Sequence, residues 1–119
     1  MTEAEILPRI VNSKTIDWGN HPRFEGVKMK ALLTPEDNRL ANVSMVRVPA
    51  GSIVGWHAHT SQVETVYVLA GEAVLTIGTN EFELEPGCIV AIPIGTKHTL
   101  RNAGTTDVDL IAFFTPPNS

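Results

Sequence analysis

The sequence predicts an all-β fold, either a sandwich or a barrel, preceded by a short segment of different character. Around nine short β-prone stretches follow one another at near-regular intervals from Val27 onward. Clusters of Gly, Pro, Asn and Asp separate these stretches, as expected for tight turns. No credible long helix competes with the strands. The pattern alone does not choose between the sandwich and the barrel.

The first 24 residues differ from the rest and are expected to form an N-terminal arm. Residues 2–5 have the form of a capping box for a short helical turn, which Pro8 would interrupt early. Residues 18–22 have loop composition, and within them His21 is interpreted as an ordinary surface residue or a dimer contact. A chain of 119 residues has room for one domain, so residues 25–119 are expected to form a single β domain.

Each expected strand is supported by β-branched or alternating residues between turn signals. The strongest is 63–70, which is rich in Val, Thr and Tyr. In 82–84, apolar residues alternate with glutamates, which is typical of a half-exposed strand. Cys88 starts another strand and is interpreted as a small core residue. The remaining expected strands are 27–33, 40–48, 73–77, 88–92, 98–102 and 108–114.

Composition excludes several classes of function. The formal net charge is −4 and no run of Lys or Arg exists, so the chain is not expected to bind nucleic acid. No apolar stretch approaches the roughly 20 residues that span a bilayer, and the acidic N-terminus is unlike a signal peptide. The single cysteine cannot form an internal disulfide. A cytoplasmic protein without a membrane partner is therefore expected.

Two spaced patterns carry the chemistry. The first reads Gly51-x5-His57-x-His59-x4-Glu64-x6-Gly71, and the second reads Gly87-x5-Pro93-x-Gly95-x2-His98-x3-Asn102. In a strand, His57 and His59 would leave the same face, roughly 6–7 Å apart. Glu64 can swing back across a short loop, and His98 joins them if the sheet curls. Imidazole and carboxylate donors suit first-row transition metals, so one divalent ion (Mn, Fe, Ni or Zn) is the expected cofactor.

The ten fixed positions of these patterns resemble the two defining motifs of the cupin superfamily, in its small single-domain (cupin 2) form. The resemblance is close over residues 57–102 and looser over about 27–115. It implies a double-stranded β-helix, or jelly-roll barrel, over residues 25–119. It also implies metal ligands at His57, His59, Glu64 and His98. A homodimer is implied too, and the apolar side chains of Tyr67, Ile111 and Phe113, expected to face outward, would fit one.

Strand parity suggests which other residues surround the metal. No lysine or arginine is expected to point inward, since Lys97 and Arg101 have the wrong parity relative to His98. The cupin resemblance places alternate residues of the last strand inside the barrel. The expected pocket-lining residues are Val46, Val54, Gln62, Leu100, Leu110, Ala112 and Phe114.

These features favour a small-molecule metalloenzyme of dioxygenase type that acts on a largely apolar substrate. The absence of an evident inward acid or base tilts the choice toward an oxygenase, because proton transfer usually needs one. A metal-dependent lyase or isomerase is the first alternative. A barrel that binds a small molecule without catalysis is the second, and a metal that only holds strands together is the third.

Overall fold

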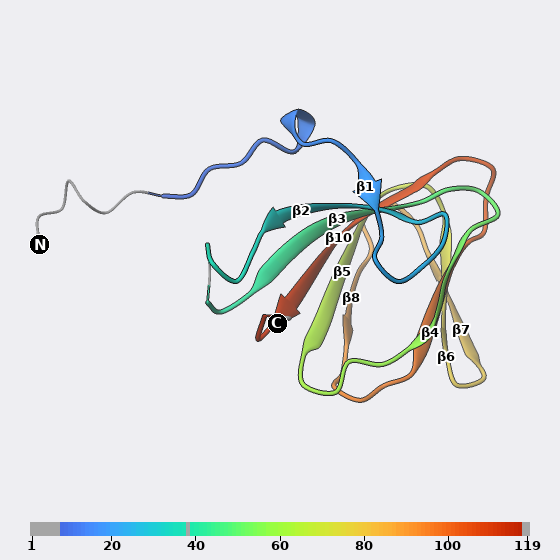
Figure 1. The fold of residues 1–119 in the computed structure, drawn as a ribbon. Helices are drawn as coiled ribbons and strands as arrows, with labels where there is room; N and C mark the ends of the chain where they lie inside the picture. The colour runs from blue at the N-terminus through green and yellow to red at the C-terminus, as the bar shows by residue number, and fades with distance from the viewer. Residues whose placement is uncertain (1–7, 38, 118–119) are drawn as a thin grey trace, which may run out of the picture.

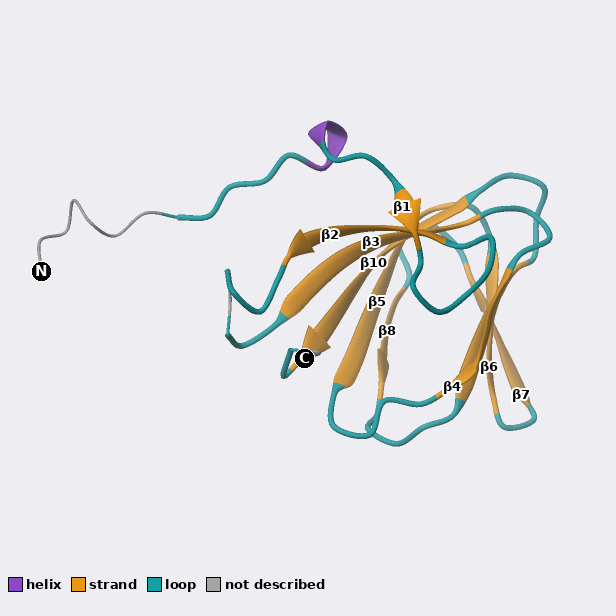
Figure 2. Ribbon diagram, viewed as in Figure 1, coloured by secondary structure: helices purple, strands orange, loops and turns teal. Residues whose placement is uncertain are grey.

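The chain folds into two antiparallel β-sheets that face each other (Figure 1). The structure, a computed structural model, describes residues 8–37 and 39–117. Over these residues it contains ten strands, one short 3-10 turn and no α-helix (Figure 2). The all-β, jelly-roll prediction is confirmed. The capping box predicted at residues 2–5 lies outside the described residues.

The strands are short, and eight of the ten in the described part of the chain overlap predicted stretches, while Gly19–Asn20 and Ile53–His57 were not predicted as strands. The 3-10 turn is Ser13–Thr15. The strands are β1 Gly19–Asn20, β2 Lys28–Leu33, β3 Asn42–Val48, β4 Ile53–His57, β5 Val63–Ala70, β6 Ala73–Ile77, β7 Asn80–Leu84, β8 Ile89–Ile92, β9 His98–Asn102 and β10 Val108–Thr115.

Neighbouring strands are mostly far apart in the sequence. The larger sheet has the order β1-β2-β3-β10-β5-β8, and the smaller has the order β4-β9-β6-β7. Strand β4 pairs with β9 so that His57 lies opposite His98. Strand β5 pairs with β10 so that Glu64 lies opposite Phe114. The two sequence motifs are thus brought to the same end of the barrel, with His57 and His98 on the smaller sheet and Glu64 on the larger.

A core of branched aliphatic side chains begins at the other end. Val48, Val68 and Val108 are at most 1% exposed. In the larger sheet, Val108 of β10 pairs with Val48 of β3. This pair lies six residues along β10 from Phe114, which pairs with Glu64. Full burial of one such side chain stabilises the fold by about 1.5–3 kcal/mol. These three valines therefore lie away from the motif residues, whereas the core continues along the barrel to Ile92, which pairs with Glu64.

The N-terminal segment takes more part in the barrel than its loop composition indicates. Gly19 and Asn20 form β1 and pair with Met29 and Lys28 of β2. Phe24 packs against the core cluster. This strand is absent from the sequence prediction, because a two-residue stretch of Gly and Asn has no β propensity of its own.

Candidate metal centre

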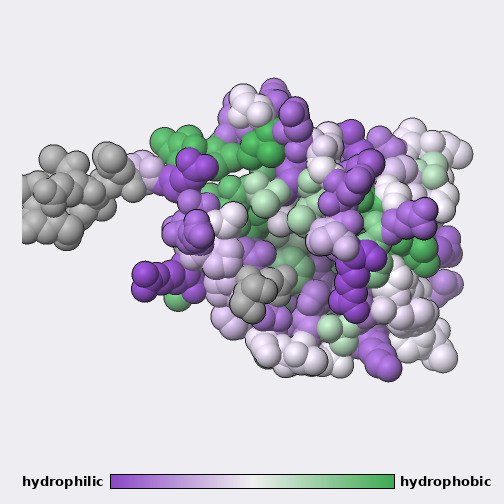
Figure 3. Space-filling view, viewed as in Figure 1, coloured by the Kyte–Doolittle hydropathy of each residue, from purple (hydrophilic) through white to green (hydrophobic). Residues whose placement is uncertain are grey.

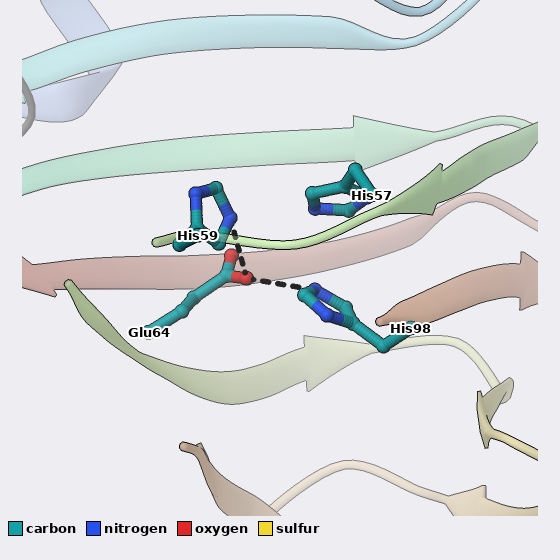
Figure 4. A group of neighbouring side chains, drawn as sticks. All are labelled: His57, His59, Glu64 and His98. Carbon is teal, nitrogen blue, oxygen red and sulfur yellow. Dashed lines mark hydrogen bonds and ion pairs between the residues drawn. The ribbon is translucent and has the colours of Figure 1, made fainter. Parts of the chain in front are cut away.

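Four side chains from the two motifs converge at the open end of the barrel (Figure 4). One nitrogen from each of His57, His59 and His98 and one carboxylate oxygen of Glu64 all lie within 4.8 Å of one another. Ligands on opposite sides of a first-row ion are about 4.2 Å apart, from bond lengths near 2.1 Å. Shifts of a few tenths of an ångström would bring all four onto one ion, so the cluster is positioned to hold a metal.

His59 reaches the cluster by a different route from the one predicted. Strand β4 ends at His57, so His59 lies in the following loop rather than on the same strand face. The loop backbone is tied to the neighbouring loop, because Gly95 N–H donates to the carbonyl of His59 at 2.7 Å. The rings of His57 and His59 still lie 5.0 Å apart, edge to face. The prediction that His57 and His59 leave the same face of one strand was wrong, although His59 lies in the cluster that the motif predicts.

Backbone carbonyls orient two of the imidazoles. Nδ1 of His57 lies 2.7 Å from the carbonyl oxygen of Gly55. Nδ1 of His98 lies 2.9 Å from the carbonyl oxygen of Thr96. A carbonyl oxygen can only accept, so each Nδ1 carries the proton and donates it. Each ring therefore turns its Nε2 toward the cluster, which is how a second layer of contacts prepares histidine for a metal.

Glu64 supplies the negative charge of the cluster. Its Oε1 lies 3.2 Å from Nε2 of His98, and the side chains are 12% and 3% exposed. Burial alone would raise the pKa of Glu64, but the imidazoles of His59 and His98 outweigh it and hold that pKa at about 2. Burial lowers the pKa of His57. The pKa of His98 is raised, because the Glu64 carboxylate and the Thr96 carbonyl outweigh the opposing effect of burial.

Two features of the donor atoms favour a shared cation. Nε2 of His59 is buried and, among the described residues, has no hydrogen-bond partner, although it lies 3.4 Å from Oε1 of Glu64. In the neutral form of His98, which carries its proton on Nδ1, Nε2 and the carboxylate oxygen of Glu64 present lone pairs to each other. A bound cation would accept a lone pair from Nε2 of His59 and would also separate the facing lone pairs of His98 and Glu64. The residues present therefore fit a divalent transition metal.

A half-open cavity of about 570 Å³ adjoins the cluster. Its wall is mostly apolar and is formed by both sheets. The seven residues expected to line a pocket all lie on this wall: Val46, Val54, Gln62, Leu100, Leu110, Ala112 and Phe114. Tyr67, Ile111 and Phe113, expected to face outward, are not part of it. Asn102, interpreted as structural, donates to the carbonyls of Val48 and Thr106 at 2.9 and 2.7 Å.

The sequence predictions missed several residues of the cavity wall, including the whole contribution of the loop between β1 and β2. His21, Arg23 and Phe24 line the cavity from the loop between β1 and β2. The interpretation of His21 as an ordinary surface residue was wrong, because its loop folds over the cavity when β1 joins the sheet. All four histidines of the chain consequently line one cavity. Parity could not find these residues, since it applies only within a strand.

Comparison with known proteins places the chain in a family. The family model of the cupin domain (Cupin_2) matches residues 44–114. An oxalate-binding protein of Thermotoga maritima is 31% identical over 92% of this chain and 87% of its own length. The chain belongs to the cupin family, and its small single-domain form is the one predicted from the motifs.

Solved structures agree on the fold. A crystal structure of a predicted oxalate decarboxylase from Thermotoga maritima superposes with a TM-score of 0.82 at 27% identity, over 91% of this chain and 99% of that one. The polyketide cyclase RemF of Streptomyces resistomycificus superposes with a TM-score of 0.80 at 17% identity, over 92% and 80%. These proteins bear names of different activities, so the fold they share does not specify the reaction of this chain.

Proposed function

We propose that the protein is a metal-dependent enzyme that acts on a small, largely apolar molecule, with dioxygenase chemistry as the reaction type. The single observation that carries this proposal is the position of the His57–His59–Glu64–His98 cluster in the wall of a cavity that is otherwise mostly apolar. Four protein ligands leave one or two positions of a five- or six-coordinate ion open. Those positions would face the cavity, where a substrate can reach them.

The protein residues have distinct tasks in this proposal. A redox-active Mn or Fe ion would supply dioxygen activation and polarise the substrate. The carbonyls of Gly55 and Thr96 hold two imidazoles in the correct tautomer. Glu64 stays ionised because of its low pKa and offsets part of the ion's charge. Apolar side chains such as Leu110 and Phe114 limit water near the reacting groups.

A metal-dependent lyase or isomerase is the second candidate, and the position of His21 favours it. The preference for an oxygenase depended on the absence of an inward acid or base. His21 lines the cavity and can supply a polar N–H there. With Zn or Ni in the cluster, Lewis-acid chemistry assisted by this imidazole would need no dioxygen.

Binding without turnover is the third candidate. The relative that is 31% identical carries the name oxalate-binding protein, which describes a ligand rather than a reaction. A carboxylate could occupy the open positions of the ion directly. A cavity of about 570 Å³ is within the ordinary range for sites that hold a drug-sized molecule, so oxalate alone would leave much of it unfilled.

One set of measurements separates the three candidates. The metal content of the purified protein is determined, and dioxygen uptake is then followed with phenols, thiols and diketones. Dioxygen uptake that is lost in His98→Ala supports the oxygenase. Product formed from the same panel without dioxygen supports the lyase or isomerase. Tight binding of panel members to the metal-loaded protein with no product under either condition contradicts both enzyme proposals. Circular dichroism checks that the variant is folded.

A further inference from the structure

We propose that His21 and Arg23 form a subsite that binds a carboxylate of the substrate, at the part of the cavity formed by the β1–β2 loop. The other end of the same molecule would meet the metal cluster. This inference rests on the proposed function, because it assigns the second point of attachment of that substrate. Four observations carry it.

The first observation is the tautomer of His21. Its Nδ1 accepts hydrogen bonds from the backbone N–H groups of Arg23 at 3.0 Å and Phe24 at 3.3 Å. A ring nitrogen that accepts carries no proton, so the ring proton is on Nε2. No described residue accepts a hydrogen bond from this Nε2–H. His21 therefore presents an unused donor in the cavity wall.

The second observation is that the loop is held in place. The backbone N–H of His21 donates to the carbonyl of Val27 at 2.8 Å, and Val27 N–H donates to the carbonyl of Phe24 at 3.3 Å. Val27 is 1% exposed and belongs to the core. The donor of His21 is thus fixed by contacts that reach the core, and a fixed donor binds its partner with less loss of entropy.

The third observation is a series of ring contacts that leads from Arg23 to the metal cluster. The guanidinium of Arg23 lies 5.5 Å from the ring centre of Phe24. The Phe24 ring lies 5.1 Å from the ring of His57, and 5.0 Å from the ring of His21. One aromatic ring therefore separates the His21–Arg23 pair from a proposed metal ligand, which is a span that a small bifunctional molecule can bridge.

The fourth observation is the charge of the wall. The chain has a net charge of −4, yet Glu64 is the only acidic residue among the described residues that line the cavity. Glu64 is already engaged with His59 and His98. Arg23 is the only lysine or arginine of that wall and forms no ion pair with a described carboxylate. A guanidinium beside a neutral N–H donor matches a carboxylate, which accepts from both.

Burial lowers the pKa of His21, and the nearby positive charge of Arg23 lowers it further against the opposing effect of Glu64. The ring is therefore neutral at physiological pH, so the positive charge that attracts the anion is that of Arg23. The two residues have separate contributions. Arg23 supplies the positive charge that attracts the carboxylate, and His21 supplies a fixed N–H donor that orients it.

The experiment uses two metal chelators that differ only at one end. Heptane-2,4-dione and 4,6-dioxoheptanoate have the same carbon chain and the same chelating dione, and only the second carries a carboxylate. Their dissociation constants for the zinc-loaded protein are measured by calorimetry. We expect the carboxylate to bind about tenfold more tightly, as charge-assisted hydrogen bonds of this kind provide.

Two variants and one control test the residues. Arg23→Gln removes the charge, while His21→Asn removes the ring donor and keeps a side-chain oxygen that can accept from the following backbone N–H groups. Each variant should lose most of the preference for the carboxylate and keep the affinity for heptane-2,4-dione. The control is Arg101→Gln, which removes the same charge from an exposed arginine paired with Glu81 away from this cavity. The control should keep the preference.

The outcomes distinguish this inference from the proposed function. Equal binding of both diones by the wild-type protein overturns the subsite and leaves the metal site standing. An equal loss of preference in Arg101→Gln also overturns it, since the effect would then be one of net charge. Failure of the zinc-loaded protein to bind either dione overturns the proposed function, and this inference with it.

Discussion

Protons and a metal ion compete for the same lone pair on His98. The pKa of His98 is raised, because Glu64 and Thr96 outweigh the opposing effect of burial. A metal binds only the deprotonated Nε2, so metal affinity should fall as the pH falls through this pKa. Each proton displaced weakens binding about tenfold per pH unit below the pKa. Competition with a chromophoric chelator between about pH 5.5 and 8 measures the slope. An affinity that does not change with pH would contradict the assignment of His98 as a ligand.

Position 71 requires glycine both for its backbone conformation and for the lack of space around it. Its φ is 82°, in the left-handed region, and a Cβ there would collide with the carbonyl of Asp107 and the backbone of Val108. Gly78 has a similar φ of 62° but open space around it. Gly78→Ala should cost about 1 kcal/mol from the backbone alone. Gly71→Ala should cost about 3 kcal/mol, because the β5–β6 turn must also move. Urea unfolding of the two variants measures the difference, and equal losses would exclude the steric contribution.

At the scale of elements, one aromatic side chain fastens the N-terminal segment to the larger sheet. The Trp18 ring contacts two cations of the sheet, the ammonium group of Lys30 at 4.6 Å from the ring centre and the guanidinium of Arg47 at 4.4 Å. Arg47 is itself fixed by two hydrogen bonds to Asp109, at 2.7 and 2.9 Å. Cation–π contacts at such sites contribute about 0.5–1 kcal/mol each.

Trp18→Ala should therefore release β1 and the loop that carries His21, with a loss of about 1–2 kcal/mol in unfolding free energy. Hydrogen exchange should accelerate at the amide of His21, which donates to Val27, while the amides of β5 and β10 keep their protection. Trp18→Phe is the matched control, since it retains an aromatic face. Unchanged exchange at His21 in Trp18→Ala would show that the segment is held by other contacts.

The residues within strands could be predicted from the sequence, whereas those in the loop after β1 could not. The metal cluster was predictable because the spacing of the two motifs identifies its four ligand residues. Glu64 and His98 meet only if the sheets fold over each other, and the motifs imply that fold. The cavity residue of β9, Leu100, followed from alternation with His98 within the strand, whereas the inward residues of β10 were implied by the cupin resemblance. His21 and Arg23 were not predictable, because their place depends on the pairing of Gly19 and Asn20 with β2, which no periodic pattern in the sequence indicates. A side chain in a loop has no periodic signal.

At the scale of the whole molecule, the apolar surface outside the barrel is consistent with the expected homodimer. Tyr67 is 37% exposed and Ile10 is 81% exposed. Figure 3 shows hydrophobic surface where the N-terminal segment leaves the barrel. We expect light scattering at micromolar concentration to give twice the chain mass of 12.9 kDa. Removal of residues 1–17 should shift the mass toward the monomer if the arm joins the partner's sheet. A full-length monomer under these conditions would contradict the prediction.

The proposed metal would also act on the molecule as a whole, because its ligands belong to both sheets. His57 and His98 come from β4 and β9 of the smaller sheet, while Glu64 comes from β5 of the larger. A bound ion would therefore add a link between the sheets to the one that the core already provides. Zinc at a hundred times its dissociation constant should stabilise the fold by about 2.7 kcal/mol and raise Tm by roughly 10 °C. Scanning calorimetry with zinc and with a chelator measures this increment.

Glu64→Gln should reduce the stabilisation by zinc and His98→Ala should abolish it, because each change removes a ligand from one sheet. An increment that survives in His98→Ala would mean that the ion binds elsewhere. Stabilisation by zinc, with neither turnover nor small-molecule binding by the protein loaded with any of Mn, Fe, Ni or Zn, would leave the metal a purely structural link between the sheets.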